Sequence, residues 1–205
     1  MNNIKVVAFD CDGVMFDSGQ ANMDYYNSIL KHFGKPQMTP DQFAFVHMHT
    51  ADEALSHLFR DPESLEAAQL FRKKMSYKPF FKSMKIEPDL ISLLKKIKLK
   101  YKTAIATNRT DTMQGILSEF NLQSFFDFVV CALDVKHSKP HPESLLKIIE
   151  YFDVEPAQVL YVGDSVVDET AAKAANIPFV SYRNDKLSAN YYITRLEELE
   201  DMLFG

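Results

Sequence analysis

Residues 6–18 read VVAFDCDGVMFDS, and they give the clearest indication of how this chain is built. An apolar run, typical of a buried strand, ends at Asp10, and a second carboxylate, Asp12, follows just before Gly13. Side chains two positions apart on a strand share a face, so both carboxylates can point at one spot. A charged carboxylate is costly to bury alone. The pair therefore predicts partners that lie elsewhere in the sequence.

Short apolar runs alternate with helical patterns along most of the chain. Strands are predicted at residues 4–9, 103–107, 126–130, 159–162 and 177–182. Helices are predicted at residues 87–100, 111–120, 142–152 and 166–175. Near-continuous apolar strands that alternate with helices are typical of a parallel sheet covered on both faces. The predicted fold class is therefore α/β.

Residues 19 to about 80 interrupt this alternation, because they contain four helical segments and no convincing strand. Pro40, Asp61-Pro62 and Pro79 separate these segments. The simplest interpretation is a helical insert placed directly after the first strand. We therefore expect a sheet-forming core made of residues 1–17 and 81–205, and an inserted helical unit formed by residues 18–80.

Composition excludes several classes of protein. The chain has 205 residues, of which 46% are hydrophobic, and this is ordinary for a globular protein with a buried core. The net charge is −5 and there is no long basic run, so we expect no nucleic-acid partner. No apolar run approaches the ~18 residues of a spanning helix, and the first residues do not resemble a signal peptide. We expect a cytoplasmic protein without a membrane partner. Two cysteines, Cys11 and Cys131, are too few for a disulfide framework.

Polar residues follow the ends of three further predicted strands. Thr107 and Asn108 end one strand, Lys139 lies in a proline-bounded loop after the next, and Asp164 ends another, with Asp168 four residues beyond it. Taken singly, each is also an ordinary turn, cap or solvated residue. Ligands bind outside the carboxyl ends of the strands in open α/β sheets. We therefore expect these side chains to converge with those of the first strand.

A convergence of Asp10, Asp12, Asp164 and Asp168 requires compensation. Two unit charges at 4 Å repel by about 4 kcal/mol at an effective dielectric constant of 20. Hard oxygen ligands with no His or Cys beside them point to Mg²⁺, and Lys139 neutralises further charge. The sequence therefore predicts a Mg²⁺ and phosphoryl-transfer site.

These motifs resemble those of the haloacid dehalogenase-like (HAD) superfamily. The matching stretches are DCDGV at 10–14, TN at 107–108, SKPHPE at 138–143 and GDSVVD at 163–168, in the family's order. The helical insert resembles the small helical cap of the phosphoglycolate phosphatase and β-phosphoglucomutase group, and Asp17-Ser18 also matches that group. The resemblance implies a Rossmann-like parallel sheet with helices on both faces and an inserted helical cap.

The resemblance also implies a role for each matched residue. Asp10 would be the nucleophile that becomes an aspartyl-phosphate, and Asp12 would be the general acid and base. The implied phosphate ligands are Thr107, Asn108 and Lys139, and the implied metal ligands are Asp10, Asp164 and the backbone carbonyl of Asp12, with Asp168 supporting the metal waters or Lys139.

These roles imply a Mg²⁺-dependent phosphatase that acts on a small phosphorylated metabolite. A sugar phosphomutase of the β-phosphoglucomutase type is the alternative, because it would use the same Asp12. Phosphonate hydrolysis would require a cap lysine such as Lys31 or Lys35, and both are interpreted as exposed charges. Dehalogenation is disfavoured because that branch of the family lacks the second aspartate, and a non-catalytic scaffold is disfavoured because every matched position carries the required residue type. The oligomeric state is left open, with a lean toward a monomer.

Two histidines in the predicted cap, His47 and His49, lie in a turn that reads HMHT at residues 47–50. One hypothesis is that one of them donates to a polar or carboxylate group on the leaving portion of the substrate. The other is that both are surface or packing residues. Zinc binding is disfavoured because no further ligand has matching spacing.

Overall fold

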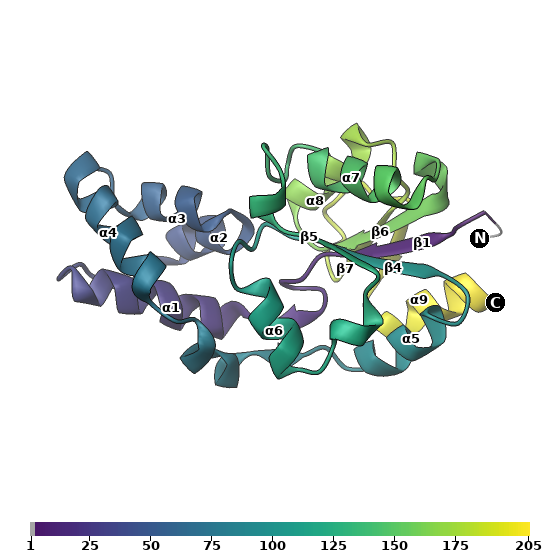
Figure 1. Cartoon of the computed structure of the whole chain (residues 1–205), viewed down its shortest axis with the longest axis horizontal. Helices are drawn as coiled ribbons and strands as arrows, with labels where there is room; N and C mark the ends of the chain where they lie inside the picture. The colour runs from purple at the N-terminus through teal and green to yellow at the C-terminus, as the bar shows by residue number, and fades with distance from the viewer. Residues whose placement is uncertain (1–2) are drawn as a thin grey trace.

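The computed structural model describes residues 3–205, and a six-stranded parallel sheet forms the centre of its larger part (Figure 1). The strand order is β5-β4-β1-β6-β7-β8. The strands are β1 (Val6–Phe9), β4 (Lys102–Ala106), β5 (Phe128–Val130), β6 (Val159–Gly163), β7 (Phe179–Tyr182) and β8 (Tyr191–Ile193). Every neighbouring pair is parallel, so the predicted α/β class is confirmed.

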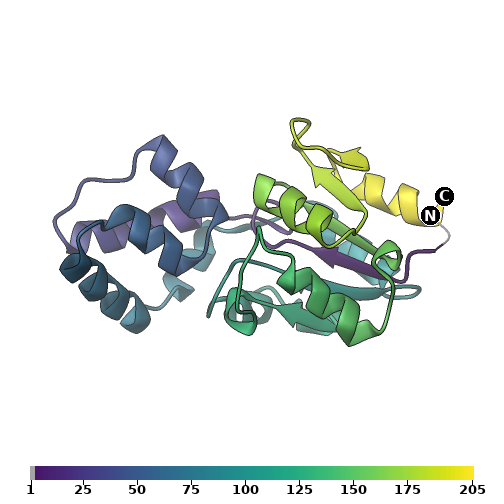
Figure 2. The ribbon, with the colours of Figure 1, turned by 90° about the horizontal axis from the view of Figure 1, so that it is seen from above.

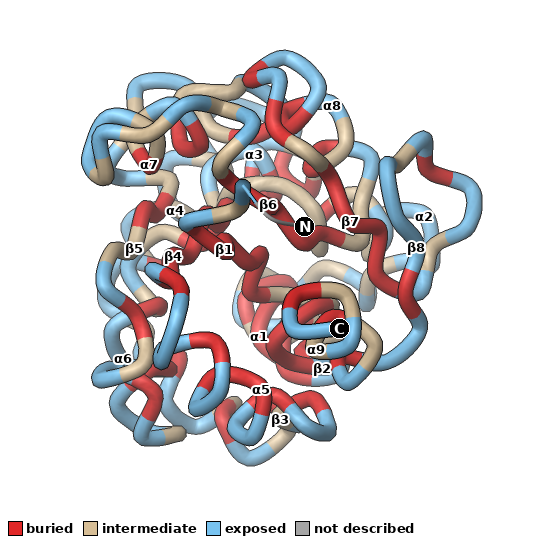
Figure 3. Tube along the Cα trace, turned by 90° about the vertical axis from the view of Figure 1, so that its right-hand side faces the viewer, coloured by how far each residue is buried: buried red, intermediate tan, exposed pale blue. Residues whose placement is uncertain are grey.

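Helices cover both faces of the sheet because the central strands are apolar on both sides. Val7 and Phe9 of β1 belong to the core that includes helices α5, α6 and α9, whereas Val6 and Ala8 pack with α7 and α8. The alternation follows from the two-residue period of a strand. Figure 3 shows the central strands as buried. The helices are α5 (Leu90–Ile97), α6 (Met113–Glu119), α7 (Glu143–Phe152), α8 (Val166–Ala174) and α9 (Leu196–Phe204).

The helical insert holds α1 (Gly19–His32), α2 (Pro40–Met48), α3 (Ala51–Leu58) and α4 (Pro62–Lys74), which lie together at one end of the molecule (Figure 2). Their starts follow from local sequence. The side chains of Thr39 and Thr50 accept hydrogen bonds from backbone N–H groups at the starts of α2 and α3, and Asp61 does the same for α4. The turn predicted at 47–50 is shorter than expected, because α2 continues through Met48. None of the helices in residues 3–205 combines the length and the apolar character needed to traverse a bilayer.

Two short strands escaped the sequence prediction. β2 (Phe16–Asp17), which directly precedes α1, pairs antiparallel with β3 (Lys85–Ile86), which follows the 3₁₀ segment Lys78–Ser83. They carry no periodic signal because each has only two residues. The edge strand β8 was missed for a different reason, since Tyr191 and Tyr192 are exposed and give no apolar run. The range 18–80 for the inserted unit stays a prediction.

Candidate active site

The predicted site residues lie at the carboxyl ends of the central strands. Asp10 follows β1, Thr107 follows β4 and Asp164 follows β6. In the sheet, β4 and β5 lie on one side of β1, and β6, β7 and β8 lie on the other. The strand order therefore reverses next to β1, and ligands bind at the carboxyl ends of the strands around such a point. A cleft that is open to solvent lies here. Residues of the sheet-bearing part and of the helical insert both line it.

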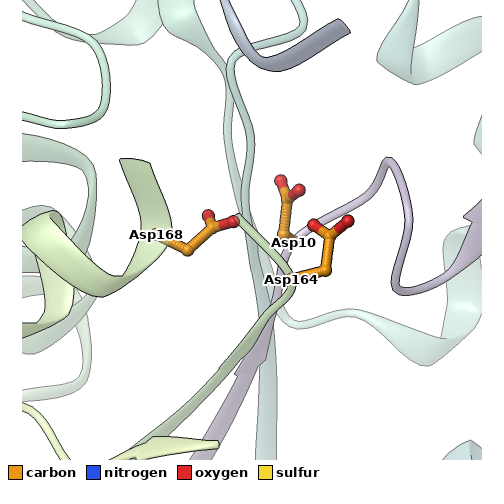
Figure 4. A group of neighbouring side chains, drawn as sticks. All are labelled: Asp10, Asp164 and Asp168. Carbon is orange, nitrogen blue, oxygen red and sulfur yellow. The ribbon is translucent and has the colours of Figure 1, made fainter. Parts of the chain in front are cut away.

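Three carboxylates gather at this edge of the sheet. One oxygen of each of Asp10, Asp164 and Asp168 lies within 4.8 Å of the others. Figure 4 shows Asp10 and Asp164 at adjacent strand ends and Asp168 reaching toward them from the first turn of α8. These three predicted site residues therefore lie together, whereas Asp12, the fourth aspartate of the predicted cluster, is not one of this group.

Two glycines make room for the carboxylates. A Cβ atom on Gly13, whose φ is +82°, would lie 2.1 Å from Oδ2 of Asp164. A Cβ atom on Gly163 would lie 2.5 Å from the Cβ of Asp168. Any larger residue would push these aspartates away, so both glycines are required by close approach and Gly13 also by its backbone conformation.

Lys139 holds the centre of the cluster and is only 2% exposed. Its Nζ lies 2.7 Å from Oδ1 of Asp10, 2.7 Å from Oδ1 of Asp168 and 2.9 Å from the carbonyl of Ala106. Burial acts to lower the pKa of Lys139, but the two carboxylates outweigh burial and raise this pKa, so the ammonium stays charged.

Asp168 is committed to Lys139 and to neighbouring donors. Its Oδ1 also accepts a hydrogen bond of 2.7 Å from the hydroxyl of Tyr161, and its Oδ2 accepts from the backbone N–H and the hydroxyl of Ser165. Tyr161 was not identified from the sequence, where it reads as one more apolar position of a buried strand. Of the two roles implied for Asp168, these contacts match the support of Lys139.

Asp164 differs from Asp168, because only its backbone carbonyl, and not its carboxylate, is hydrogen-bonded within the described residues. Burial, reinforced by the nearby charges of Asp168 and Asp10, raises the pKa of Asp164 well above its usual range. Burial also raises the pKa of Asp10 to about 7, although Lys139 opposes the shift. Neither carboxylate has enough positive charge nearby to offset the cost of burying its ionised form.

Arg109 is the main candidate that the sequence did not reveal. Its Nη2 lies 2.6 Å from Oδ1 of Asp12, and both side chains are largely buried. The same oxygen accepts from the hydroxyl of Ser18. Burial acts to raise the pKa of Asp12, but the charge of Arg109 and these hydrogen bonds lower it overall. An arginine two positions after a strand-end threonine is a weak signal, because spacing does not say which carboxylate it reaches.

The charges of the cluster fit a divalent cation. The four aspartates and the two buried cations, Lys139 and Arg109, leave an excess of two negative charges when all the carboxylates are ionised. One of these charges falls on Asp164, whose carboxylate has no cationic partner among residues 3–205, and the other is shared by Asp10 and Asp168, which have only Lys139 between them. Carboxylate oxygens are ligands of hard divalent cations, so the donor set fits such an ion.

The two strand-end residues implied as phosphate ligands differ in their contacts. The hydroxyl oxygen of Thr107 accepts a 3.2 Å hydrogen bond from the backbone N–H of Arg109, and Thr107 lines the cleft. The side-chain amide of Asn108 donates to the carbonyls of Met48 and Lys139, both at 2.9 Å, and accepts from the N–H of Lys139. Both amide protons of Asn108 are thus engaged, one by Met48 of the helical insert and the other by the loop that carries Lys139.

The cap histidines both line the cleft but have different surroundings. Nδ1 of His47 lies 3.0 Å from the amide nitrogen of Asn22, which in turn lies 3.4 Å from Oδ1 of Asp12. Burial lowers the pKa of His47, which suits an imidazole that accepts from Asn22. His49 contacts the carbonyl of Phe45 at 2.8 Å and stacks on its ring. The functional hypothesis for the pair stays a prediction.

Comparisons with known proteins agree on one family. The family described as haloacid dehalogenase-like hydrolase matches residues 7–182. A phosphoglycolate phosphatase of Aquifex aeolicus is 29% identical over 174 residues, covering 84% of this chain and 81% of that protein. The crystal structure of a HAD-superfamily hydrolase of subfamily IA from Geobacter sulfurreducens is 37% identical, with a TM-score of 0.80 and coverage of 98% of this chain and 97% of that one.

A β-phosphoglucomutase from Clostridium difficile superposes with a TM-score of 0.85 over 98% of this chain and 96% of its own, at 20% identity, which is a likeness of fold alone. The resemblance inferred from the motifs is thereby confirmed. Since the family match spans most of the chain and includes Asp10, Thr107 and Asp164 at the strand ends and Lys139 in its loop, this protein belongs to the haloacid dehalogenase-like hydrolases.

Proposed function

We propose that this protein is a Mg²⁺-dependent phosphatase that hydrolyses a small phosphomonoester through an aspartyl-phosphate on Asp10. The observation that carries the proposal is the buried lysine bridge. Lys139 holds Oδ1 of Asp10 at 2.7 Å beside Asp164, at the floor of an open cleft. A carboxylate fixed in this way can attack phosphorus, because its orientation is set before the substrate arrives.

The first half of the reaction uses Asp10 and Asp12. An oxygen of Asp10 forms a bond to phosphorus while the bond from phosphorus to the ester oxygen breaks. Asp12, which is ion-paired with Arg109 in the structure, has to leave this pair and take up a proton first. It then gives the proton to the departing oxygen, and a neutral alcohol leaves. In the second half Asp12 takes a proton from water, which attacks the aspartyl-phosphate and releases inorganic phosphate and free Asp10. The two halves together restore both aspartates.

Two further residues support the phosphoryl group. Thr107 lines the cleft, and because its hydroxyl oxygen already accepts from the N–H of Arg109, its proton is directed to another acceptor, for which a phosphate oxygen is suitable. Lys139 places a positive charge beside the nucleophile. The ammonium therefore offsets the repulsion between Asp10 and an anionic phosphate.

Mg²⁺ would be held by Asp10, Asp164 and the backbone carbonyl of Asp12. When bound, it supplies charge neutralisation between the carboxylates and the phosphoryl oxygens. The support for this assignment is the all-oxygen donor set and the excess negative charge, part of which falls on Asp164. Asp168 stays in its hydrogen bonds with Lys139 and Tyr161 and orients the lysine.

Residues 18–80 are proposed to act as a cap over this site. The support is that residues of α1 and α2 line the same cleft as the strand ends. The phosphonatase alternative gains no support, since neither Lys31 nor Lys35 is among the described residues that line the cleft, and Lys35 instead lies over the ring of Phe59.

The test is hydrolysis of a chromogenic aryl phosphate by the wild type and by Asp10→Asn. Asparagine keeps the shape of the side chain but is not a nucleophile, so kcat is expected to fall at least ~10³-fold with an unchanged circular dichroism spectrum. Activity of Asp10→Asn near that of the wild type would refute the assignment. Transfer of the phosphoryl group between positions of a sugar phosphate, in place of transfer to water, would support the mutase alternative.

A further inference from the structure

Two buried arginines line the cleft and have spare hydrogen-bonding capacity. Arg72 of α4 and Arg109 after β4 are both buried, and the Nε of each has no partner among the described residues. Arg72 pairs with Asp111, whose side chain is 51% exposed and has no role in the proposed reaction. Arg109 pairs with Asp12, the proposed acid. The carboxylate that pairs with Arg109 therefore takes part in the proposed reaction, whereas the one that pairs with Arg72 does not.

The guanidinium of Arg109 is held in place by contacts on several sides. Its Nη1 donates to the hydroxyl of Thr112 at 3.1 Å, and its guanidinium lies 5.1 Å from the centre of the Tyr77 ring. Its Nη2 lies 3.4 Å from both the Tyr77 hydroxyl and Oδ1 of Asn22. The Tyr77 hydroxyl is itself fixed, because it donates to Asn22 at 2.5 Å. A planar fork fixed from several sides is suited to receive an oxyanion.

Asp12 has to reach the leaving oxygen in the proposed reaction, yet its Oδ1 is held by Arg109 and Ser18. A neutral hydroxyl that separated Asp12 from Arg109 would leave the guanidinium buried without a counter-charge, which is strongly unfavourable. An anionic group would restore the balance of charge and release Asp12 at the same time. The favourable exchange partner for Arg109 is therefore an anion.

We propose that Arg109 is a specificity-determining residue that binds an oxyanion on the leaving portion of the substrate, taking it in exchange for the carboxylate of Asp12. Asp12 contacts the ester oxygen in the proposed reaction and Arg109 contacts Asp12 at 2.6 Å, so the oxyanion belongs on a short leaving group, close to the ester. This inference rests on the proposed phosphatase function. A carboxylate and a second phosphate share the required chemistry, and the two are separated by experiment.

The test compares esters of primary alcohols that differ only in charge. Phosphoglycolate carries a carboxylate where hydroxyethyl phosphate carries a hydroxymethyl group, and ethylene glycol bisphosphate provides the second-phosphate arm. The kcat/KM of the wild type is expected to favour one of the two charged esters over hydroxyethyl phosphate by about tenfold or more, the worth of a hydrogen bond to a charged group. The better charged ester identifies the oxyanion.

Arg109→Gln should abolish this preference, and Arg109→Lys should keep part of it because the charge remains without the fork. The ratio of two kcat/KM values for one variant does not depend on the fraction of enzyme that is folded, so a folding defect cannot imitate the result. Arg72→Gln is the matched control, since it removes a second buried arginine with the same free Nε.

Three results would overturn the inference: equal kcat/KM for charged and neutral esters, a preference that survives in Arg109→Gln, or a preference that is lost as fully in Arg72→Gln as in Arg109→Gln. An equal fall for all esters in Arg109→Gln would also overturn it, because that is the result expected if Arg109 only positions Asp12. Failure to hydrolyse any ester, the aryl phosphate included, would instead refute the proposed function itself.

Discussion

At the scale of single residues, the site is organised by two buried cations that pair with three of its four aspartates. Lys139 serves Asp10 and Asp168, and Arg109 serves Asp12. Asp164 is left to the divalent cation that the donor set fits. Breaking a buried pair by removing one partner is strongly destabilising, because the other charge stays buried. Substitutions at these positions therefore need variants that keep the charge or the shape of the side chain.

Tyr161→Phe removes the hydroxyl that donates to Asp168 without changing the shape of the buried ring. We expect unfolding free energy to fall by about 1.5–3 kcal/mol, the range for a hydrogen bond to a charged group, and kcat to fall because Lys139 loses a neighbour. Urea denaturation and aryl phosphate kinetics measure both effects. Tyr192→Phe is the control, since the hydroxyl of the exposed Tyr192 contacts only backbone groups: it donates to the carbonyl of Leu187 and accepts from the N–H of Ala189. Equal stability of the two variants would contradict the prediction.

The cap histidines give a second prediction at this scale. His47→Ala removes the acceptor for Asn22, which contacts Asp12, so kcat/KM on the best substrate of a phosphate-ester panel should fall about tenfold. Hydrolysis of a generic aryl phosphate should survive. His49→Ala should mainly lower stability, by about 1 kcal/mol, because the ring stacks on Phe45. Indistinguishable kinetics of His47→Ala and the wild type on every ester would make both histidines packing residues.

At the scale of elements, the turns after the strands do more than the strands themselves to shape the site. The strands bring Asp10 and Asp164 to one edge, but the glycines that precede or follow them set how closely the carboxylates approach. Element boundaries were predicted less well than element types. The helix predicted from residue 87 begins at Leu90, because Asp89 adopts a left-handed conformation with φ of 64°. Such a local conformation leaves no periodic signal in the sequence.

Gly13→Ala tests the turn after β1. A Cβ atom would lie 2.1 Å from Oδ2 of Asp164, so Asp164 has to move, and the apparent affinity for Mg²⁺ should fall by about tenfold or more. A Mg²⁺ titration of activity measures this change. Gly34→Ala is the matched control, because Gly34 also has a positive φ but has nothing within 4 Å of the added atom. A Mg²⁺ dependence that changes equally in both variants would show that strain, and not contact with Asp164, is responsible.

At the scale of the whole molecule, the cleft lies between the sheet and the helical insert, which are joined by polar side chains and by a shared apolar core. Asn108 bonds the carbonyl of Met48, and Arg72 of α4 pairs with Asp111. The chain passes into and out of the insert through the paired strands β2 and β3. These contacts position the lining residues of the insert over the carboxylate cluster.

Metal binding at this cluster should stabilise the whole fold, because the site exists only when the chain is folded. At a Mg²⁺ concentration of about 100 times Kd, linkage adds ~2.7 kcal/mol, which corresponds to a rise in Tm of roughly 5–10 °C for a chain of this size. Differential scanning fluorimetry measures the rise, and EDTA should remove it together with the activity. Asp164→Asn, which keeps the shape of the side chain, should lose most of the rise. KCl at equal ionic strength is the control for the added salt. Full activity in chelated buffer would contradict the metal assignment.

The sequence by itself determined the α/β class and the residues that gather at the sheet edge. Buried strands read as apolar runs, and the carboxyl ends of parallel strands necessarily meet at one edge, so Asp10, Thr107 and Asp164 could be brought together from their order alone. The tertiary structure decided the pairing of charges. Arg109 and Asp12 are 97 positions apart, and their contact depends on how two turns and a helical insert pack. Tyr161 likewise reads as a core residue until its hydroxyl is placed beside Asp168. Side-chain reach across packed elements has no periodic signature, which is why these partners appear only in three dimensions.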